Sequence, residues 1–498
     1  MSDNIKKIFI KGVTWAGIER ISTQAIQFIT TIVLARLLSP KDFGIVGMAT
    51  IFIQLQSTIN QMGLPAAIIQ RKGISEEHLS SVFWANIIVS SMLCLITISC
   101  SGLAASFFRN PAVNPILFAL SFLFIIGSFR GVNYALLTKE LKFSKLAFIN
   151  IGEIFSNGVV SILLAVLNYG AWSLVWGRLF GVLVGSLLTL FLYPWRPKFI
   201  FVFSKVKELF KFGANVVGSN LLTYVGQNTD YLVVGRFFGS VSLGIYTMAY
   251  NLITLPQRKL SSIVTDVAFP AFSQIQNEPQ KLAKGYLKMM KYISLVTFPL
   301  LCGLMITAPE FVNIVLGRKW AGAIVPMQIM CLAGMIKSVG TTVGSLFYAL
   351  GKPDLELKLD ILFVLLIVPL LLLAAKWGII GVAIAVTVHA VISWIICFYA
   401  VAKLIKVKFV EFFKVMLPAS FLSLSIITIL FIYKYLFILY FENTVVLFSS
   451  SVCLGVLLYF LLIKRASEEM YQEFLKPLLN RLKNHRFKSN KFILEQNL

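Results

Sequence analysis

The chain has 498 residues, of which 58% are hydrophobic and only 13% charged, and its mean hydropathy is +0.84. Soluble domains carry roughly 25% charged residues, so this composition excludes a soluble protein and indicates a polytopic membrane protein. The net charge of +24 does not indicate nucleic-acid binding, because no soluble segment is long enough to form a basic domain.

The apolar runs of the chain predict an all-α membrane protein with about fourteen transmembrane helices. The first 30 residues pass from the basic KKIFIK into a long apolar run without a cleavage site, so we expect no cleaved signal peptide. A span of a ~30 Å hydrocarbon layer needs about 20 residues. Runs of this length lie at approximately 12–38, 43–63, 80–106, 115–137, 147–167, 170–193, 212–237, 243–265, 285–308, 323–350, 357–376, 378–402, 412–433 and 444–463.

The loops between these runs predict the orientation of the chain. Most lysines and arginines fall in the loops on the same side as the N-terminus, which the positive-inside rule places in the cytoplasm. An even number of spans puts both termini on that side. The six cysteines lie in apolar runs and show no metal-ligand spacing, so we expect neither a metal site nor a cofactor.

A signature near the first predicted turn occurs twice, 200 residues apart. LARLLSPKDFGIVGMA (Leu34–Ala49) aligns without a gap with VGRFFGSVSLGIYTMA (Val234–Ala249). Similar pairs of segments follow the fourth and tenth runs (YALLTKELKF and YALGKPDLEL) and open the sixth and twelfth (NYGAWSLVWG and KWGIIGVAIA). The first six and the next six helices are therefore predicted to be two parallel copies of one unit, an arrangement typical of alternating-access transporters.

The repeat divides the chain into five predicted regions. They are an N-terminal lobe (1–193), a basic amphipathic cytoplasmic connector (194–211), a C-terminal lobe (212–403), two extra helices (404–463) and a basic cytoplasmic tail (464–498). The connector and the tail each place apolar residues on one helical face, so we expect both to lie on the membrane surface.

Together these features resemble a known group of transporters. The 6+6+2 arrangement and the segments LARLLSPKDFG, GLPAAIIQRK (Gly63–Lys72), YGAWSLVWG and DYLVVGRFFGSVSLGIYTMAYNL are similar to the polysaccharide-exporter branch of the multidrug/oligosaccharidyl-lipid/polysaccharide exporter superfamily. Within that branch they resemble lipopolysaccharide-biosynthesis flippases of the colanic-acid exporter type.

The resemblance implies a flippase of the bacterial inner membrane and no enzymatic activity. Its substrate would be an undecaprenyl-pyrophosphate-linked oligosaccharide repeat unit, moved from the cytoplasmic to the periplasmic leaflet for surface polysaccharide biosynthesis. Partners would be this lipid-linked oligosaccharide, membrane lipids and polysaccharide polymerase or assembly proteins, with no nucleic acid. The sequence leaves open which glycan is carried, and whether protons, sodium or the membrane potential drive the transport.

Ionisable side chains within the apolar runs are the predicted functional residues. Each costs about 2.5–3.5 kcal/mol at mid-membrane, so such residues are functional candidates. Guanidinium and ammonium groups suit a pyrophosphate, and the candidate substrate-binding residues are Arg20, Arg130, Arg178 and Lys337. Candidate sites for a coupling cation are Glu19, Glu153 and Asp230. The alternative is that these charges only tie helices together.

The repeated signature itself is interpreted as a helix-hairpin turn. Arg36 and Arg236 are predicted to be interfacial anchors at the outer ends of their helices, since a long side chain can reach the headgroups there. In SPKD, Ser39 is expected to N-cap the second helix, with Pro40 at its first position and Asp42 in its first turn.

Three other functions compete with the flippase. A multidrug or cation exporter of the same fold should have an acidic, aromatic cavity, whereas the buried charges here are mainly basic. A membrane glycosyltransferase or glycan ligase needs acidic residues clustered at an outer surface, where this chain offers only Asp42, Glu310 and Glu442, far apart in sequence. A purely structural scaffold does not explain the buried charges.

Overall fold

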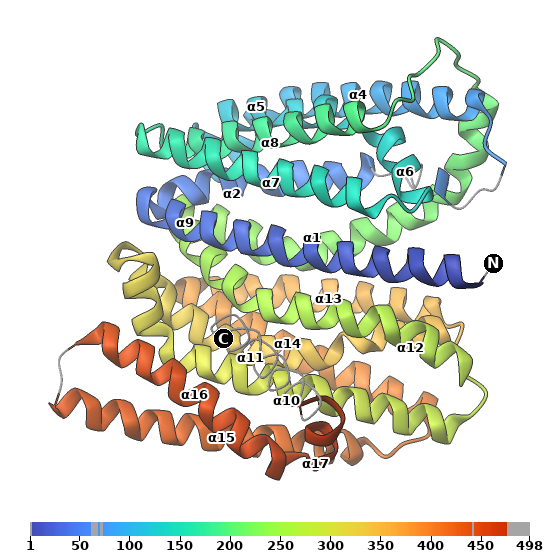
Figure 1. Ribbon diagram of the computed structural model, residues 1–498. Helices are drawn as coiled ribbons and strands as arrows, with labels where there is room; N and C mark the ends of the chain where they lie inside the picture. The colour runs from blue at the N-terminus through green and yellow to red at the C-terminus, as the bar shows by residue number, and fades with distance from the viewer. Residues whose placement is uncertain (1, 61–67, 70–72, 441–442, 476–498) are drawn as a thin grey trace, which may run out of the picture. The chain divides into compact units, whose positions relative to one another are not determined.

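The computed structural model describes residues 2–60, 68–69, 73–440 and 443–475, and every regular element in these ranges is helical (Figure 1). The α-helices are α1 (Ser2–Leu37), α2 (Pro40–Asn60), α4 (Glu76–Phe108), α5 (Val113–Ser128), α6 (Gly131–Lys139), α7 (Phe143–Val166), α8 (Ala171–Leu192), α9 (Phe203–Gln274), α10 (Pro279–Phe311), α11 (Ile324–Gly340), α12 (Thr342–Ala349), α13 (Pro353–Ala374), α14 (Gly378–Ile405), α15 (Phe409–Tyr440), α16 (Thr444–Ala466) and α17 (Glu468–Met470). Short 3-10 or π-helical segments are η1 (Val312–Leu316), η2 (Arg318–Ala323), η3 (Ala375–Trp377) and η4 (Tyr471–Leu475). Most of the Gly63–Lys72 motif and the tail beyond residue 475 lie outside the described residues.

The helices are long and apolar enough for a polytopic membrane protein. Within the described ranges, nine helical stretches pass this test by length and composition, or ten if α5 and α6, bent by 46° at Phe129–Arg130, count as one span. Two of the stretches contain a glycine in the left-handed region, Gly239 (φ 78°) within α9 and Gly378 (φ 69°) at the start of α14. A glycine adopts this conformation without a steric penalty, so the chain can change direction at both places.

The predicted start of the second helix is confirmed. The α2 helix begins at Pro40, and the Asp42 backbone N–H donates to the Ser39 hydroxyl oxygen (3.3 Å). The Asp42 carboxylate in turn accepts from the Ser39 backbone N–H (2.9 Å). These reciprocal bonds satisfy N–H groups at the helix N-terminus that have no intrahelical partner.

The chain divides into two compact units, and each is described by itself. Unit 1 comprises Met1–Met248, Val315–Ala323 and Asp360–Ala385, and unit 2 comprises Ala249–Ile314, Ile324–Leu359 and Val386–Leu498. In unit 1, α7 packs between α1 and α8, α8 packs on α5, and α5 packs on α2 and α4 (Figure 1). Small apolar clusters fill the spaces between these helices, for example Leu34, Leu38 and Ala165 between α1, its following turn and α7.

A stripe of glycines brings α7 and α8 into close contact. Gly177, Gly181 and Gly185 recur every fourth residue along one face of α8. A Cβ on Gly181 would lie 2.8 Å from the Glu153 carbonyl oxygen, and one on Gly177 would lie 2.9 Å from the Asn157 carbonyl oxygen. Membrane helices lack a hydrophobic driving force for association, so they pack through small residues that allow the backbones to approach.

This stripe predicts that a single methyl group will destabilise the protein. We expect Gly181→Ala to lower the unfolding free energy in detergent by ~1–3 kcal/mol, because the new Cβ meets the backbone of α7. Gly102→Ala in α4 is the matched control, since a Cβ there has no neighbour within 4 Å. The thermal midpoint of the purified protein measures both. Equal midpoints for the two variants would contradict the close packing of α7 on α8.

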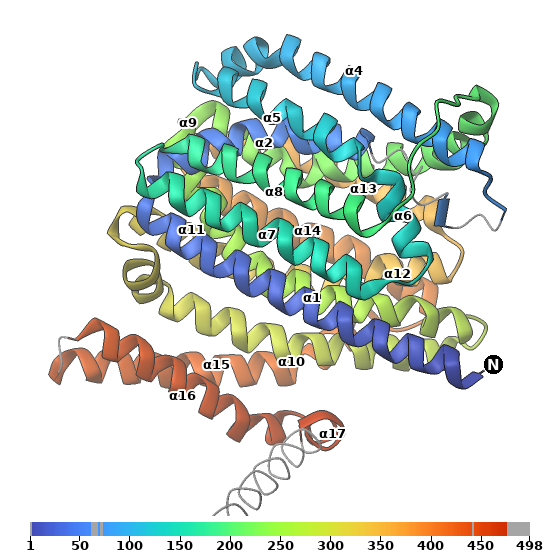
Figure 2. The same ribbon diagram turned by 45° about the horizontal axis from the view of Figure 1, so that its top comes forward.

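In unit 2, α10 is the central helix and packs on α11, α15 and α16 (Figure 2). A cluster of buried aromatic rings lies at its first half, where Tyr286 contacts Phe398 and Phe412 with ring centroids 6.3 Å apart in both pairs. Trp394 packs on Phe398 at 5.0 Å. Further along, α10 contributes Leu295 to a core shared with Ala419 of α15 and Ile463 of α16.

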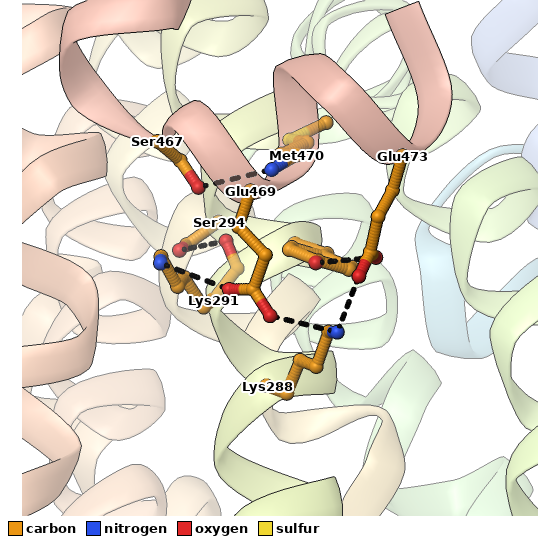
Figure 3. A network of polar contacts seen from close by, with 8 residues as sticks. Lys288, Lys291, Ser294, Ser467, Glu469, Met470 and Glu473 are labelled. Carbon is orange, nitrogen blue, oxygen red and sulfur yellow. Dashed lines mark hydrogen bonds and ion pairs between the residues drawn. The ribbon is translucent and has the colours of Figure 1, made fainter. Parts of the chain in front are cut away.

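The segment after α16 is fastened to α10 by a set of ion pairs, here called the C-terminal clasp (Figure 3). The Lys288 ammonium lies 2.8 Å from carboxylate oxygens of both Glu469 and Glu473. Lys291 lies 3.6 Å from Glu469, and the Tyr292 hydroxyl donates to Glu473 (2.8 Å). Hydrogen bonds from Lys288 hold the pKa of the Glu469 and Glu473 carboxyls below their usual value.

The clasp predicts a dependence on pH. Because both carboxyls have a lowered pKa in the folded state, their contribution is present above pH 4.5 and is lost as the pH falls through the folded-state values. We expect residues 467–473 to be protected from hydrogen exchange at neutral pH and to lose protection as the pH falls below 4.5, after correction for intrinsic rates. Lys288→Gln should remove the protection at neutral pH, whereas Lys414→Gln, which loses only a surface pair with Glu411, should not. Protection that is the same in Lys288→Gln would show that the clasp does not hold this segment.

Candidate functional site

The structure brings three of the predicted residues together in unit 1. Arg130, at the bend between α5 and α6, forms an ion pair with Glu153 of α7, and both side chains are mostly buried. Arg178 of α8 interacts electrostatically with the same carboxylate. Gly185 makes room for the pair, since a Cβ there would lie 2.6 Å from the Glu153 carboxylate and 2.8 Å from the Arg130 guanidinium. These residues form one polar cluster among the helices α5 to α8.

Glu19 lies near the same stretch of α7. Its carboxylate accepts from the Asn150 amide (2.8 Å), and that amide also donates to the Tyr134 hydroxyl (3.1 Å). Asn150 precedes Glu153 by one helical turn, so the partners of Glu19 and of Arg130 lie on neighbouring turns of one helix. Arg20, next to Glu19 on α1, has an exposed side chain.

Asp230 is buried within α9, near its Gly239 kink. The side chain is 4% exposed, and its carboxylate accepts from the Tyr246 hydroxyl (2.7 Å). The rings of Tyr231 and Tyr246 pack edge to face at 5.6 Å beside it. A buried carboxylate without a hydrogen-bond partner would be costly, and Tyr246 supplies one from the other side of the kink.

Lys337 lies in unit 2, in the last turn of α11. Its ammonium lies 3.3 Å from the Tyr250 hydroxyl oxygen and 5.4 Å from the centre of that ring, a distance at which a cation is attracted to the aromatic face. The predicted tenth span is interrupted at Thr341, between α11 and α12, four residues after Lys337.

Both predicted anchors contact backbone carbonyl groups. The Arg36 Nε donates to the Val315 carbonyl oxygen (2.8 Å), and the guanidinium of Arg236 donates to the Phe107 carbonyl oxygen and lies over the Phe107 ring. Arg36 is exposed and Arg236 is half-buried. Carbonyl groups at the end of a helix lack intrahelical partners and carry partial negative charge, which an arginine can satisfy.

One buried ion pair was not predicted from the sequence. Lys434 of α15 lies 2.7 Å from the Glu310 carboxylate of α10 and also donates to the Ile306 carbonyl oxygen (2.8 Å). The predicted ninth and thirteenth spans (285–308 and 412–433) end before these two residues, which places both in short outer loops. The helices continue through both positions, and no periodicity in the sequence pairs residues so far apart. Among the described residues, no group of three His, Cys, Asp or Glu could hold a metal ion.

The geometry therefore offers a cluster of two arginines and a carboxylate in unit 1 and a lysine beside a tyrosine in unit 2. Arginine and lysine side chains bind oxyanions, and a carboxylate binds a cation. None of these groups is an activated nucleophile. A family model described as polysaccharide biosynthesis protein matches residues 33–325. The chain belongs to this family.

Curated relatives agree with this assignment. The lipopolysaccharide biosynthesis protein WzxC of Escherichia coli is 28% identical over 407 residues, which cover 80% of this chain and 82% of that protein. The teichuronic acid biosynthesis protein TuaB of Bacillus subtilis is 29% identical over 423 residues, covering 82% and 86%. The probable low-salt glycan biosynthesis flippase Agl15 of Haloferax volcanii is 22% identical over 412 residues, covering 81% and 84%.

Solved structures show the fold. The lipid II flippase MurJ in an inward closed conformation superimposes with a TM-score of 0.75 and 14% identity, over 93% of this chain and 100% of that one. An inward-facing multidrug resistance MATE transporter of the MOP superfamily gives a TM-score of 0.60 at 15% identity, over 78% and 99%. The predicted membership of the polysaccharide-exporter branch is confirmed. The protein is a multi-pass membrane transporter of polysaccharide biosynthesis and not an enzyme, so the glycosyltransferase alternative is set aside.

Proposed function

We propose that the protein is a flippase that moves an undecaprenyl-pyrophosphate-linked oligosaccharide repeat unit from the cytoplasmic to the periplasmic leaflet by alternating access. The names of WzxC, TuaB and Agl15 support a role in glycan assembly. The likeness to multidrug transporters concerns the fold alone and does not favour a drug as substrate. The partners proposed with this function are the lipid-linked oligosaccharide, membrane lipids and polymerase or assembly proteins.

The observation that carries this proposal is that the fourth helix of each copy is interrupted beside a partly buried basic residue. Arg130 lies at the break between α5 and α6, and Lys337 lies one turn before the break between α11 and α12. In the sequence repeat, α5 and α6 together form the fourth helix of the first copy, and α11 and α12 form that of the second copy. At both breaks a backbone N–H bonds to the carbonyl three residues back, Arg130 to Gly127 and Thr341 to Ser338. Transporters with such repeats bind substrate at interrupted helices near the middle of the membrane.

The fourteen-helix arrangement and its regions belong to the same proposal. Adding α1 and α2 to the ten candidate stretches, and dividing two stretches at Gly239 and Gly378, gives the predicted number. We retain the lobes 1–193 and 212–403, the connector 194–211, the extra helices 404–463 and the tail 464–498, with both termini in the cytoplasm of a bacterial cell. The excess of basic residues in the loops on the N-terminal side supports this orientation.

In the proposed mechanism, Arg130 exchanges one anionic partner for another. The guanidinium that binds Glu153 can instead donate two parallel hydrogen bonds to two oxygens of a phosphate. Glu153 then loses its counter-charge, and a proton or a sodium ion takes its place. Phosphate binding and cation uptake become parts of one exchange, with Arg178 close to the same carboxylate. Arg20, Glu19 and Asp230 remain further candidates for contact with the substrate or the coupling cation.

We expect both Arg130 and Lys337 to be required for export of the repeat unit. In cells from which the gene for this chain is deleted, lipid-linked repeat units should accumulate on the cytoplasmic face. We expect Arg130→Gln and Lys337→Gln to restore export about 10- to 100-fold less efficiently than the wild type, since each loses a charge-assisted contact to phosphate. Lys281→Gln, which removes a surface lysine paired with Glu278, should restore it fully. Accumulation is measured from glycolipids labelled in the cytoplasmic leaflet. Normal export by both variants at normal protein levels would show that neither residue binds the substrate.

The second prediction separates cation coupling from substrate binding. Flipping by the wild type in proteoliposomes should slow when the proton and sodium gradients are collapsed while the membrane potential is held. Glu153→Gln keeps the shape of the side chain but cannot exchange a cation for Arg130, so its flipping should not respond to the gradients. Glu411→Gln, at an exposed pair with Lys414, should behave like the wild type. A wild type that ignores the gradients would leave the membrane potential as the driving force and exclude the exchange.

A further inference from the structure

The two copies of the repeated signature touch each other at equivalent residues within unit 1. A Cβ on Gly44 would lie 1.7 Å from the Ser240 carbonyl oxygen, and one on Gly244 would lie 1.9 Å from the Pro40 carbonyl oxygen. Gly44 corresponds to Gly244 in the repeat, and Pro40 corresponds to Ser240. Each copy therefore makes the same contact with the other, as across a twofold axis. Only a residue without a side chain permits so close an approach of two backbones.

The two arginines of the signature form a second reciprocal contact. Arg36, in the first copy, binds the Val315 carbonyl oxygen in η1, the segment that directly follows α10. Arg236, in the second copy, binds the Phe107 carbonyl oxygen in the last turn of α4. In the repeat, α4 and α10 are the third helices of the two copies. Each arginine thus binds a carbonyl at the end of the third helix of the opposite copy.

The η2 segment covers this contact. Trp320 is fully buried, its indole N–H donates to the Ala35 carbonyl oxygen (2.8 Å), and its ring packs edge to face on Phe43 (5.3 Å). Lys319 donates to the Arg36 carbonyl oxygen (2.7 Å), so two carbonyls at the end of α1 are satisfied from η2. At the other copy, a Cβ on Gly322 would lie 3.1 Å from Ile245. The segment therefore rests on both copies at once.

We propose that these contacts form a reciprocal latch, made by Arg36, Gly44, Arg236, Gly244 and Trp320, that closes the outer end of the translocation path and parts in every transport cycle. This inference rests on the proposed function, because alternating access requires the contacts that join the two copies here to part in the other state. The latch is suited to repeated opening. Apart from the Trp320 ring and the contact of Arg236 with the Phe107 ring, it consists of backbone contacts and hydrogen bonds to carbonyl oxygens. Water can replace these hydrogen bonds when the copies separate.

The latch is tested by the accessibility of a residue beneath it. Met48 is fully buried one helical turn after Gly44. A cysteine introduced there by Met48→Cys should react only when the latch opens. The exposed Cys100 and Cys453 are replaced by serine in the parent protein, so that they do not react. We expect Gly44→Ala and Gly244→Ala each to increase the labelling of the introduced cysteine by a membrane-impermeant maleimide, added from outside, by about tenfold or more, because the added methyl group prevents closure. Gly47→Ala is the matched control on the same helix, since its Cβ would lie 3.6 Å from Leu243, an ordinary contact. It should label like the parent.

A second pair of variants tests the latch without adding volume. Arg36→Gln and Arg236→Gln each remove one of the two equivalent hydrogen bonds, and each should raise the labelling of the same cysteine by several-fold. They decide the question where the glycine variants fail to fold, as judged by gel filtration and thermal unfolding. Folded glycine or arginine variants that label like the parent would overturn the latch. Labelling needs no substrate. If the labelling changes as expected but the protein does not move the repeat unit, the result counts against the proposed function alone.

Discussion

A polar group within the apolar helices of this chain must find its partner inside the protein, because lipid offers none. Unit 2 shows the consequence in its central helix. Pro309 has no backbone N–H, so it leaves the Met305 carbonyl of α10 without its helical partner. The Gln328 side chain of α11 donates to that carbonyl (3.1 Å), and Lys434 of α15 binds Glu310 and the Ile306 carbonyl a turn away. These hydrogen bonds and this ion pair determine which helices pack against α10 and at which position along its axis they do so.

In unit 1 the same constraint joins structure to the proposed transport. The Arg130–Glu153 pair satisfies two charges at the bend between α5 and α6, and Gly185 provides the space for them. A buried ion pair of this kind contributes little net stability, since the desolvation of both charges offsets their attraction. Apolar side chains of the same volume would hold the helices at least as well. A pair that can exchange partners has a use that apolar residues lack, which is why we place substrate binding and cation uptake here.

The sequence predicts the helices of this protein better than it predicts their partners. Composition and apolar runs indicate an all-helical membrane protein, and local rules place the start of α2 at Pro40, because Ser39 and Asp42 act within one turn. The repeat points to two equivalent turns. It does not show that the two turns touch each other. Nor does it show the partner of Arg36, because this is the backbone carbonyl of Val315, 279 residues away, and any residue could supply a carbonyl. The break at Arg130 does have a local signal, because Gly127, Ser128 and Gly131 surround it and Gly/Ser pairs are common at helix kinks. These residues do not show which helices the break faces.

Those breaks have an electrostatic consequence that the proposed substrate would use. An interrupted helix presents a new N-terminus, whose free N–H groups and partial positive charge favour an anion. In this chain α6 begins at Gly131, directly after Arg130, and α12 begins at Thr342, shortly after Lys337. Each copy of the repeat therefore has a basic residue and a new helix N-terminus within its fourth helix. A single phosphate needs only one such site. Either break alone therefore provides the groups that bind one phosphate of a pyrophosphate.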